Sequence, residues 1–156
     1  MNDKPRRKRI RLPLAVYSDD SRIFHIIVCT FERRPLFHMD EYARPVFDSI
    51  TGHLAGTMKL YVASLLPDHV HLLLTPDERD LIHEMRAWKT FTTNTLHKIG
   101  VRGTIWQPSF YDHVIRQTED IGEVASYVLA NPVRKGLCED YREYRYNYWS
   151  WKTGGS

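Results

Sequence analysis

The chain has 156 residues, of which 42% are hydrophobic and 26% are charged, and a chain of this kind is typical of one compact domain that buries about 68–70% of its unfolded surface. Eight glycines and eight prolines are too few for a fibrous or low-complexity protein. The two cysteines, Cys29 and Cys138, form no CxxC pair, which excludes a cysteine-based metal site and indicates a reducing, cytoplasmic compartment. Every apolar run is far shorter than the ~20 residues of a membrane span, so we expect a soluble protein with no membrane partner.

The net charge of +3 is distributed unevenly along the chain. Residues 1–11 carry six basic residues and one acidic residue, a net +5, so the remainder carries a net −2. We therefore expect a flexible basic arm at 1–20, a single folded domain at 21–151 and a short tail at 152–156. A cationic arm can neutralise phosphates and accelerate encounter with nucleic acid, but many basic termini only improve solubility. The arm alone therefore leaves nucleic-acid binding open.

The first half of the folded region predicts a strand, a helix and a hairpin. Residues 22–30 are β-branched and apolar and lie between two charged turns, which predicts the first strand. From Asp40 onward, apolar residues recur at helical spacing, although Pro45 falls within the first turns. Two further apolar runs, at 60–66 and 69–74, are separated by a Pro-Asp turn. This pattern predicts a β-hairpin.

The second half predicts two more helices and a strand. A long helix opens at Asp80 and closes at Gly100, and residues 105–116 favour extended structure. A last helix is expected over 118–131, where a proline stops it, and the aromatic segment 141–151 suggests an irregular cap over the sheet. The order of these elements predicts an α+β fold of the ferredoxin-like or RRM-like kind (RRM, RNA-recognition motif). Such a fold has a mostly antiparallel sheet with helices packed on one face.

Two histidines alternate along the second strand of the predicted hairpin. His69 and His71 point to the same face of that strand, with Cα atoms about 6.6–6.8 Å apart, while Val70 points to the other face. Two neutral imidazoles in this arrangement can bind one metal ion, although such a pair is more often ordinary polar residues on a strand. Asp68, just before the pair, can orient one ring as a hydrogen-bond acceptor or simply form the turn.

A second candidate group lies on the last predicted helix. Tyr127 and Asn131 are four residues apart and share one helix face, with Glu123 one turn earlier. A tyrosine in such a place more often belongs to a packing surface, and an asparagine before a proline more often caps a helix. These two residues therefore assign no chemistry by themselves.

Three blocks of sequence are more informative together, because they occur in a specific order. They are the His-x-His segment at 66–74, the aromatic segment at 106–116 and the segment at 127–137 that begins with the tyrosine. Together they resemble the single-tyrosine HUH transposases, and within that superfamily the tyrosine transposases associated with repetitive extragenic palindromes (REP). The resemblance spans roughly residues 22–150, which is nearly all of the predicted folded region.

The resemblance implies a role for each candidate residue. His69 and His71 would be the paired metal ligands. Tyr127 would be the catalytic nucleophile, and Asn131 would complete the metal site. The implied reaction is metal-dependent cleavage and rejoining of single-stranded hairpin DNA through a 5′-phosphotyrosine intermediate, with Mg²⁺ or Mn²⁺ as the cofactor. These residue types suit that chemistry, because a phenol with a pKa of about 10 is a poor nucleophile at neutral pH unless the developing charge is stabilised.

The expected partner is single-stranded DNA that forms a palindromic hairpin, and the sequence is compatible with a homodimer and with a monomer. Basic residues on the arm, on the helix that opens at Asp80 and beside the predicted site are candidates for DNA contacts, although each is also a common solvated surface charge. They are Arg6, Arg7, Lys8, Arg9, Arg86, Lys89, Arg116, Arg134 and Lys135.

Two other kinds of function fit the same residues. A non-catalytic module, or a domesticated descendant of a transposase, would bind single-stranded nucleic acid without cleaving it. A metal-dependent phosphodiesterase would use water as its nucleophile, so it would stay active without the Tyr127 hydroxyl. Formation of a covalent adduct with a labelled hairpin strand separates the transposase from both alternatives.

Overall fold

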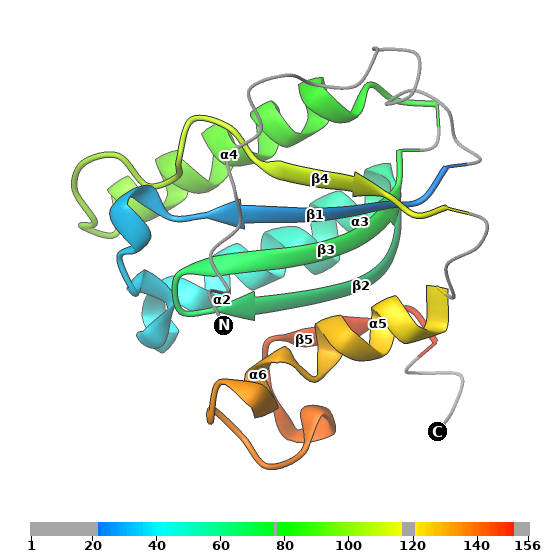
Figure 1. Cartoon of the computed structure of the whole chain (residues 1–156). Helices are drawn as coiled ribbons and strands as arrows, with labels where there is room; N and C mark the ends of the chain where they lie inside the picture. The colour runs from blue at the N-terminus through cyan, green and yellow to red at the C-terminus, as the bar shows by residue number, and fades with distance from the viewer. Residues whose placement is uncertain (1–21, 77, 117–120, 152–156) are drawn as a thin grey trace.

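A five-stranded antiparallel sheet forms the centre of the molecule, in a computed structural model that describes residues 22–76, 78–116 and 121–151 (Figure 1). The spatial order of the strands is β4-β1-β3-β2-β5, and each neighbouring pair is antiparallel. The strands are β1 (Phe24–Cys29), β2 (Lys59–Leu66), β3 (His69–Thr75), β4 (Tyr111–Val114) and β5 (Asn147–Trp149). The predicted basic arm, the first residues of the last predicted helix and the short tail lie outside the described residues.

The helices follow the predicted order, with differences at their ends. The longer ones are α2 (Asp40–Ser49), which continues through a π-helical turn, η3 (Ile50–Leu54), into α3 (Ala55–Thr57), and α4 (Leu81–Lys98). After them come α5 (Ile121–Leu129) and α6 (Asn131–Arg134), and three short 3₁₀ turns are η1 (Phe31–Arg33), η2 (Leu36–His38) and η4 (Tyr141–Glu143). None of the helices within the described ranges has the length and apolar composition needed to cross a membrane.

Local sequence determines where α4 begins and ends, as predicted. The Asp80 side chain accepts hydrogen bonds from the backbone N–H groups of Ile82 and His83, which would otherwise lack partners at the helix start. Gly100 follows the helix with a φ of +105°, a conformation that glycine adopts without steric cost. The helix predicted from Asp40 also forms, and Pro45 lies inside it rather than ending it.

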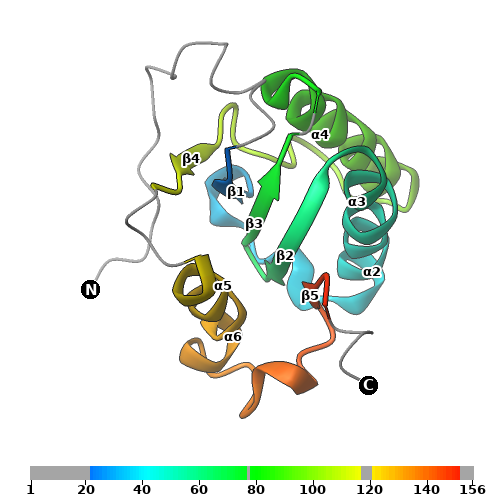
Figure 2. The same cartoon turned by 90° about the vertical axis from the view of Figure 1, so that its right-hand side faces the viewer.

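The two faces of the sheet are covered by different helices (Figure 2). The helices α2 and α4 pack on the face that carries Phe24, Ile26 and Val28 of β1, where the larger hydrophobic core forms. The helix α5 packs on the opposite face, where its residues contact Val62 and Leu73. The α+β class and the antiparallel sheet are confirmed, but the helices occupy both faces rather than one. The physical reason is that every residue of β3 is buried, with Leu72 in one core and Leu73 in the other, so both faces of the strand need a cover.

The C-terminal segment extends the sheet instead of forming the irregular cap expected from the sequence. Its residues Asn147–Trp149 form β5 and pair with Ser64, Ala63 and Val62 of β2. The Tyr144 hydroxyl donates to the backbone carbonyl of Leu65 at 2.6 Å, which fastens the approach to this edge strand. The backbone hydrogen bonds of β5 therefore satisfy the β2 edge, which would otherwise be open.

Candidate metal and nucleophile site

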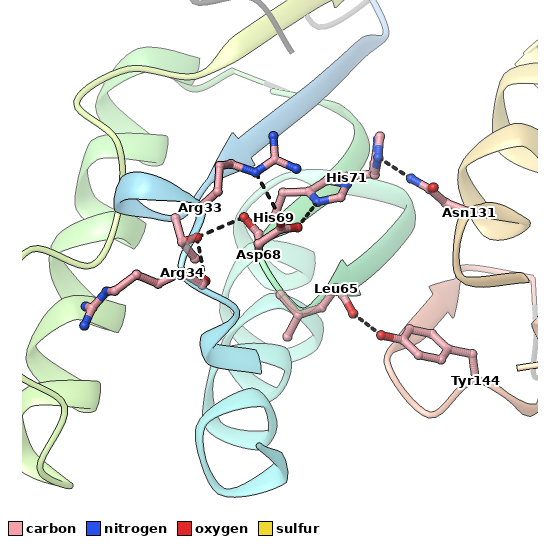
Figure 3. Close-up of polar contacts among 9 residues, drawn as sticks. Arg33, Arg34, Leu65, Asp68, His69, His71, Asn131 and Tyr144 are labelled. Carbon is pink, nitrogen blue, oxygen red and sulfur yellow. Dashed lines mark hydrogen bonds and ion pairs between the residues drawn. The ribbon is translucent and has the colours of Figure 1, made fainter. Parts of the chain in front are cut away.

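Both histidines of the predicted pair lie on β3 and face α5, as the alternation along the strand requires. Each is only 4% exposed, while Val70 between them is fully buried in the opposite core. Figure 3 shows that Asn131 approaches His71 from the start of α6. The Asn131 Nδ2 atom lies 2.5 Å from His71 Nε2, although the two residues are 60 positions apart in the chain. The structure thus brings together His69, His71 and Asn131.

His69 is oriented by the turn that precedes it. Its Nδ1 atom lies 2.7 Å from Oδ1 of Asp68, and Oδ2 of Asp68 accepts a hydrogen bond of 3.1 Å from Nε of Arg33. Burial alone would raise the pKa of Asp68, but the hydrogen bonds from His69 and Arg33 outweigh it and lower that pKa to about 2. The ionised carboxylate accepts a hydrogen bond from Nδ1–H of the ring, and in the neutral ring this leaves the lone pair on Nε2 of His69 available for a metal.

His71 is oriented by a third histidine. Nε2 of His25, on the neighbouring strand β1, lies 2.9 Å from Nδ1 of His71, and the two rings are stacked. Burial, then the positive field of His113, lowers the pKa of His25 to about 4. Burial, then His69 and His25, holds the pKa of His71 well below its usual value. Both rings are therefore neutral at physiological pH.

Because the rings of His25 and His71 are neutral, each carries one ring proton, and their hydrogen bonds indicate which nitrogen holds it. With Asn131 Nδ2 as the donor to Nε2 of His71, the ring proton of His71 is assigned to Nδ1, from which it is donated to Nε2 of His25. The lone pair of His71 Nε2 then points toward Asn131 and the start of α6. Rotation of the Asn131 amide by half a turn would present its oxygen to the same space.

Tyr127 lies on α5 and is 53% exposed, so it is not part of the packed interior. The guanidinium carbon of Arg134 lies 4.0 Å from the centre of the Tyr127 ring. The same guanidinium donates a 2.8 Å hydrogen bond to the Tyr127 backbone carbonyl, near the C-terminal end of the helix. Arg134 therefore restrains both the ring and the main chain of Tyr127 while the hydroxyl group remains on the exposed side chain.

The end of α5 differs from its prediction in a way that matters for the site. The helix ends at Leu129, and Asn131 starts the separate helix α6 rather than closing α5. Pro132 lies in the first turn of α6, where its missing N–H has no structural cost, so it restarts a helix instead of only stopping one. This break places Asn131 over the sheet, in contact with His71.

The remaining predicted DNA contacts are dispersed. Arg134 and Lys135 are exposed at the C-terminal end of α6, and Arg116 is exposed after the end of β4. Lys89 has a different role, because its ammonium donates to the backbone carbonyls of Gln107 and Ser109 at 2.6 and 3.3 Å. It fastens the loop after α4 to the helix. The residues Arg6, Arg7, Lys8 and Arg9 lie outside the described residues.

Two polar residues of the site were missed by the sequence reasoning. His25 alternates with the core residues Phe24 and Ile26, a pattern that signals its face but not its neighbour across the strand pair. Ser64 pairs with His71 across β2 and β3, and its buried hydroxyl has no hydrogen-bond partner in the part of the chain that the structure describes. Both residues could be assigned to the site only once the strand register was known.

The donor atoms fit a divalent cation that keeps positions open for other ligands. Among the described residues, no three side chains of His, Cys, Asp or Glu are grouped so that they could hold a metal. The available donors are instead Nε2 of His69, Nε2 of His71 and, after rotation of its amide, the oxygen of Asn131. Two imidazoles and an oxygen suit Mn²⁺, and Mg²⁺ commonly completes such incomplete sets with water and substrate phosphate.

A comparison with protein families identifies the class to which this chain belongs. The family model described as "Transposase IS200 like" matches residues 19–131, which is well over half of the chain. The chain belongs to this family of IS200-like transposases, in agreement with the resemblance of its sequence motifs.

The relatives with assigned names are REP-associated tyrosine transposases. That of Escherichia coli strain K12 is 31% identical over 83 residues, which cover 53% of this chain and 49% of the relative. A protein of Haemophilus influenzae assigned to the same class is 32% identical over 95 residues, covering 53% of this chain and 54% of that protein. The matched segment therefore spans about half the length of each of these relatives.

A solved structure shares the fold over most of its length. It is that of a REP-associated tyrosine transposase bound to a REP hairpin. The match covers 90% of this chain and 82% of that one, with a TM-score of 0.68 and 23% sequence identity. The match shows that the two chains share their fold.

Proposed function

We propose that this chain cleaves and rejoins single-stranded hairpin DNA in a metal-dependent reaction, with Tyr127 as the nucleophile. The observation that carries the proposal is the contact between Asn131 and His71. It joins the histidine pair of the sheet to the segment that begins four residues earlier with Tyr127. The family match supports the reaction class, and the solved relative bound to a REP hairpin supports hairpin DNA as the substrate.

In this proposal, His69, His71 and Asn131 hold Mg²⁺ or Mn²⁺. The bound ion would polarise the scissile phosphate and offset the negative charge that develops in the transition state. The protein contributes the orientation of the ligands. Asp68 holds the His69 ring, and His25 holds the His71 ring, so that both Nε2 atoms remain unprotonated.

Tyr127 would carry the DNA strand between cleavage and rejoining. Its oxygen forms a bond to the scissile phosphorus while the bond from that phosphorus to the 3′-oxygen breaks. The phenol proton is transferred overall to the 3′-oxygen, which leaves as a 3′-hydroxyl, and the 5′-phosphate remains on Tyr127. The phosphotyrosine conserves the energy of the broken bond, so attack by a 3′-hydroxyl rejoins the strand without ATP. The Arg134 guanidinium over the ring limits the directions from which Tyr127 can act.

A labelled palindromic oligonucleotide incubated with the protein and Mn²⁺ tests the proposal on a denaturing gel. We expect a covalent protein–DNA species and a shorter strand from the wild type, and neither from Tyr127→Phe, which should bind the hairpin normally. Tyr141→Phe is a matched control, because Tyr141 is also exposed but lies on η4 beside Trp149. Cleavage by Tyr127→Phe without any adduct would show that water is the nucleophile and would contradict the proposal.

A further inference from the structure

Two successive residues beside the proposed site have an unusual backbone conformation. Glu32 and Arg33, in η1, both have a φ of +55°, although neither is a glycine. Residues with a side chain rarely adopt this left-handed conformation, because it brings the Cβ atom close to the backbone. Such conformations persist only where surrounding contacts enforce them, and they are concentrated at functional sites. The side chains that this turn directs are therefore candidates for a function.

Hydrogen bonds fasten the η1 turn to the hairpin that carries the histidines. The buried Thr30 hydroxyl shares its hydrogen bond between the backbone carbonyls of Arg34 and Asp68, at 2.8 and 3.1 Å. The Thr30 N–H also donates to the Asp68 carbonyl, and the Arg33 N–H donates to the Thr30 carbonyl, both at 3.0 Å. These contacts fix the position of Arg33 relative to the turn that precedes His69.

The strained turn places a guanidinium beside the first histidine of the pair. Nε of Arg33 donates to Oδ2 of Asp68 at 3.1 Å, while Oδ1 of the same carboxylate contacts the His69 ring. A single carboxylate therefore links Arg33 to a proposed metal ligand. Figure 3 shows that the Arg33 side chain extends from η1 over Asp68, toward the side on which the two histidine rings lie.

Most of the hydrogen-bonding capacity of Arg33 is unused. A guanidinium has five N–H donors, and four of them belong to the two terminal nitrogens. In the ranges that the structure describes, neither terminal nitrogen of Arg33 donates to another residue, although the side chain is only 19% exposed. Donors so far removed from water need an acceptor. A phosphate group suits them, because two of its oxygens match the spacing of the two terminal nitrogens.

We propose that Arg33 is a catalytic residue, which binds a non-bridging oxygen of the phosphate that Tyr127 attacks. The inference rests on the proposed function and adds a charged group to the metal ligands and the nucleophile. In the transition state of phosphoryl transfer, negative charge is spread over the non-bridging oxygens. A guanidinium that is already in position stabilises that charge without reorganisation. This role gives the strained turn a reason, because the turn holds Arg33 in place before DNA binds.

Binding measurements on the full chain test the phosphate contact separately from catalysis. The probes are fluorescent palindromic oligonucleotides in which one phosphate at a time is replaced by an uncharged methylphosphonate, and EDTA prevents cleavage. Arg33→Gln should weaken binding of the unmodified oligonucleotide about tenfold in fluorescence anisotropy. This loss should disappear at one modified position, because the contact is then already absent. That position should be the phosphate to which Tyr127 becomes attached when Mn²⁺ is present.

Rates and metal affinity separate a catalytic Arg33 from one that only orients His69. At saturating DNA, Arg33→Gln should slow adduct formation by about 10²–10³-fold, and Arg33→Lys by less, because lysine retains the charge but not the paired donors. Affinity for Mn²⁺ without DNA, measured by electron paramagnetic resonance, should change little in both variants. Arg142→Gln is the matched control, because it breaks another arginine–aspartate pair, with Asp140 on η4, and should change none of these values.

The outcomes also separate this inference from the proposed reaction. Additive losses at every modified position, or a wild-type affinity in Arg33→Gln, overturn the inference. Weaker Mn²⁺ binding with unchanged DNA binding overturns it too, because Arg33 then acts only through Asp68. Coupling to one phosphate in a protein that forms no adduct keeps the Arg33 contact and contradicts the proposed reaction. An adduct without coupling at any position does the reverse. Because η1 contains no buried residue, circular dichroism should show unchanged folding of the Arg33 variants.

Discussion

The two faces of the sheet serve different purposes, although the same strands form both. On the α2 and α4 face, alternate residues such as Val70, Leu72 and Leu74 enter a large apolar core. On the α5 face, the intervening residues are His69, His71 and Leu73, and the apolar cluster under the helix is small. One face therefore supplies most of the stability, while the other positions polar groups at a limited cost in stability.

Neighbouring leucines on β3 give the strongest test of this difference between the two faces. Leu72 and Leu73 are both fully buried but belong to opposite clusters. Leu72→Ala should lower the free energy of unfolding by about 3–5 kcal/mol, because it leaves a cavity in the large core. Leu73→Ala should cost less, about 2–3 kcal/mol, since the small cluster can collapse more easily. Urea unfolding measures both values.

The same pair should show the opposite order in activity. At a temperature where both variants are folded, Leu73→Ala should slow adduct formation, because Leu73 packs against the helix that carries Tyr127. Leu72→Ala should leave the rate nearly unchanged. Similar rates for the two variants would mean that the faces are not functionally separate.

The next effect in size concerns the histidine that the sequence reasoning missed. His25→Phe should weaken Mn²⁺ binding by about 10–100-fold, because His71 loses the partner that holds its ring and tautomer. Electron paramagnetic resonance of free Mn²⁺ measures the affinity without requiring DNA. His25→Gln retains a hydrogen-bonding group and should restore part of it. His38→Phe, at an exposed histidine in η2, is the control, and an unchanged affinity in His25→Phe would remove His25 from the site.

The difference between His69 and His25 shows what could be predicted from the sequence. Alternation along one strand was sufficient to place His69 and His71 on the same face. The N-cap at Asp80 could also be predicted, because it involves residues that are neighbours in the chain. His25 contacts His71 across 46 residues, and this contact depends on the register between β1 and β3. No local pattern encodes such a register.

The pairing of the C-terminal segment and the placement of α5 were difficult to predict for the same reason, because both depend on contacts between residues that are distant in the chain. The aromatic and polar residues near Asn147 gave no clear strand period, and only pairing with β2 makes them an edge strand. The consecutive leucines Leu72 and Leu73 did carry a signal for helices on both faces, since neighbouring apolar residues on a strand point to opposite sides and each side needs a cover. The sequence therefore predicted elements and local caps more fully than their contacts.

A smaller effect is expected where the edge strand holds α5. The Asn147 side chain donates to the carbonyls of Leu129 and Tyr141 at 2.9 and 3.1 Å. Asn147→Ala should lower the free energy of unfolding by about 1–3 kcal/mol, because these two buried carbonyls lose their hydrogen-bond donor. Hydrogen exchange should become faster in α5 and stay unchanged in α4. Equal acceleration in both helices would indicate that Asn147 supports the whole fold rather than one face.

The smallest effect is expected at the exposed ring itself. Arg134→Gln removes the cation over the Tyr127 ring and weakens the hydrogen bond to the Tyr127 backbone carbonyl. A cation–π contact at an exposed site is worth about 0.5–1 kcal/mol, which corresponds to a two- to five-fold slower rate of adduct formation. Single-turnover measurements at saturating hairpin concentration separate this rate from DNA affinity. Lys135→Gln changes the neighbouring exposed charge and should affect affinity more than rate. If both variants alter only affinity, Arg134 acts as a phosphate contact, and the α5 face positions its nucleophile without help from that side chain.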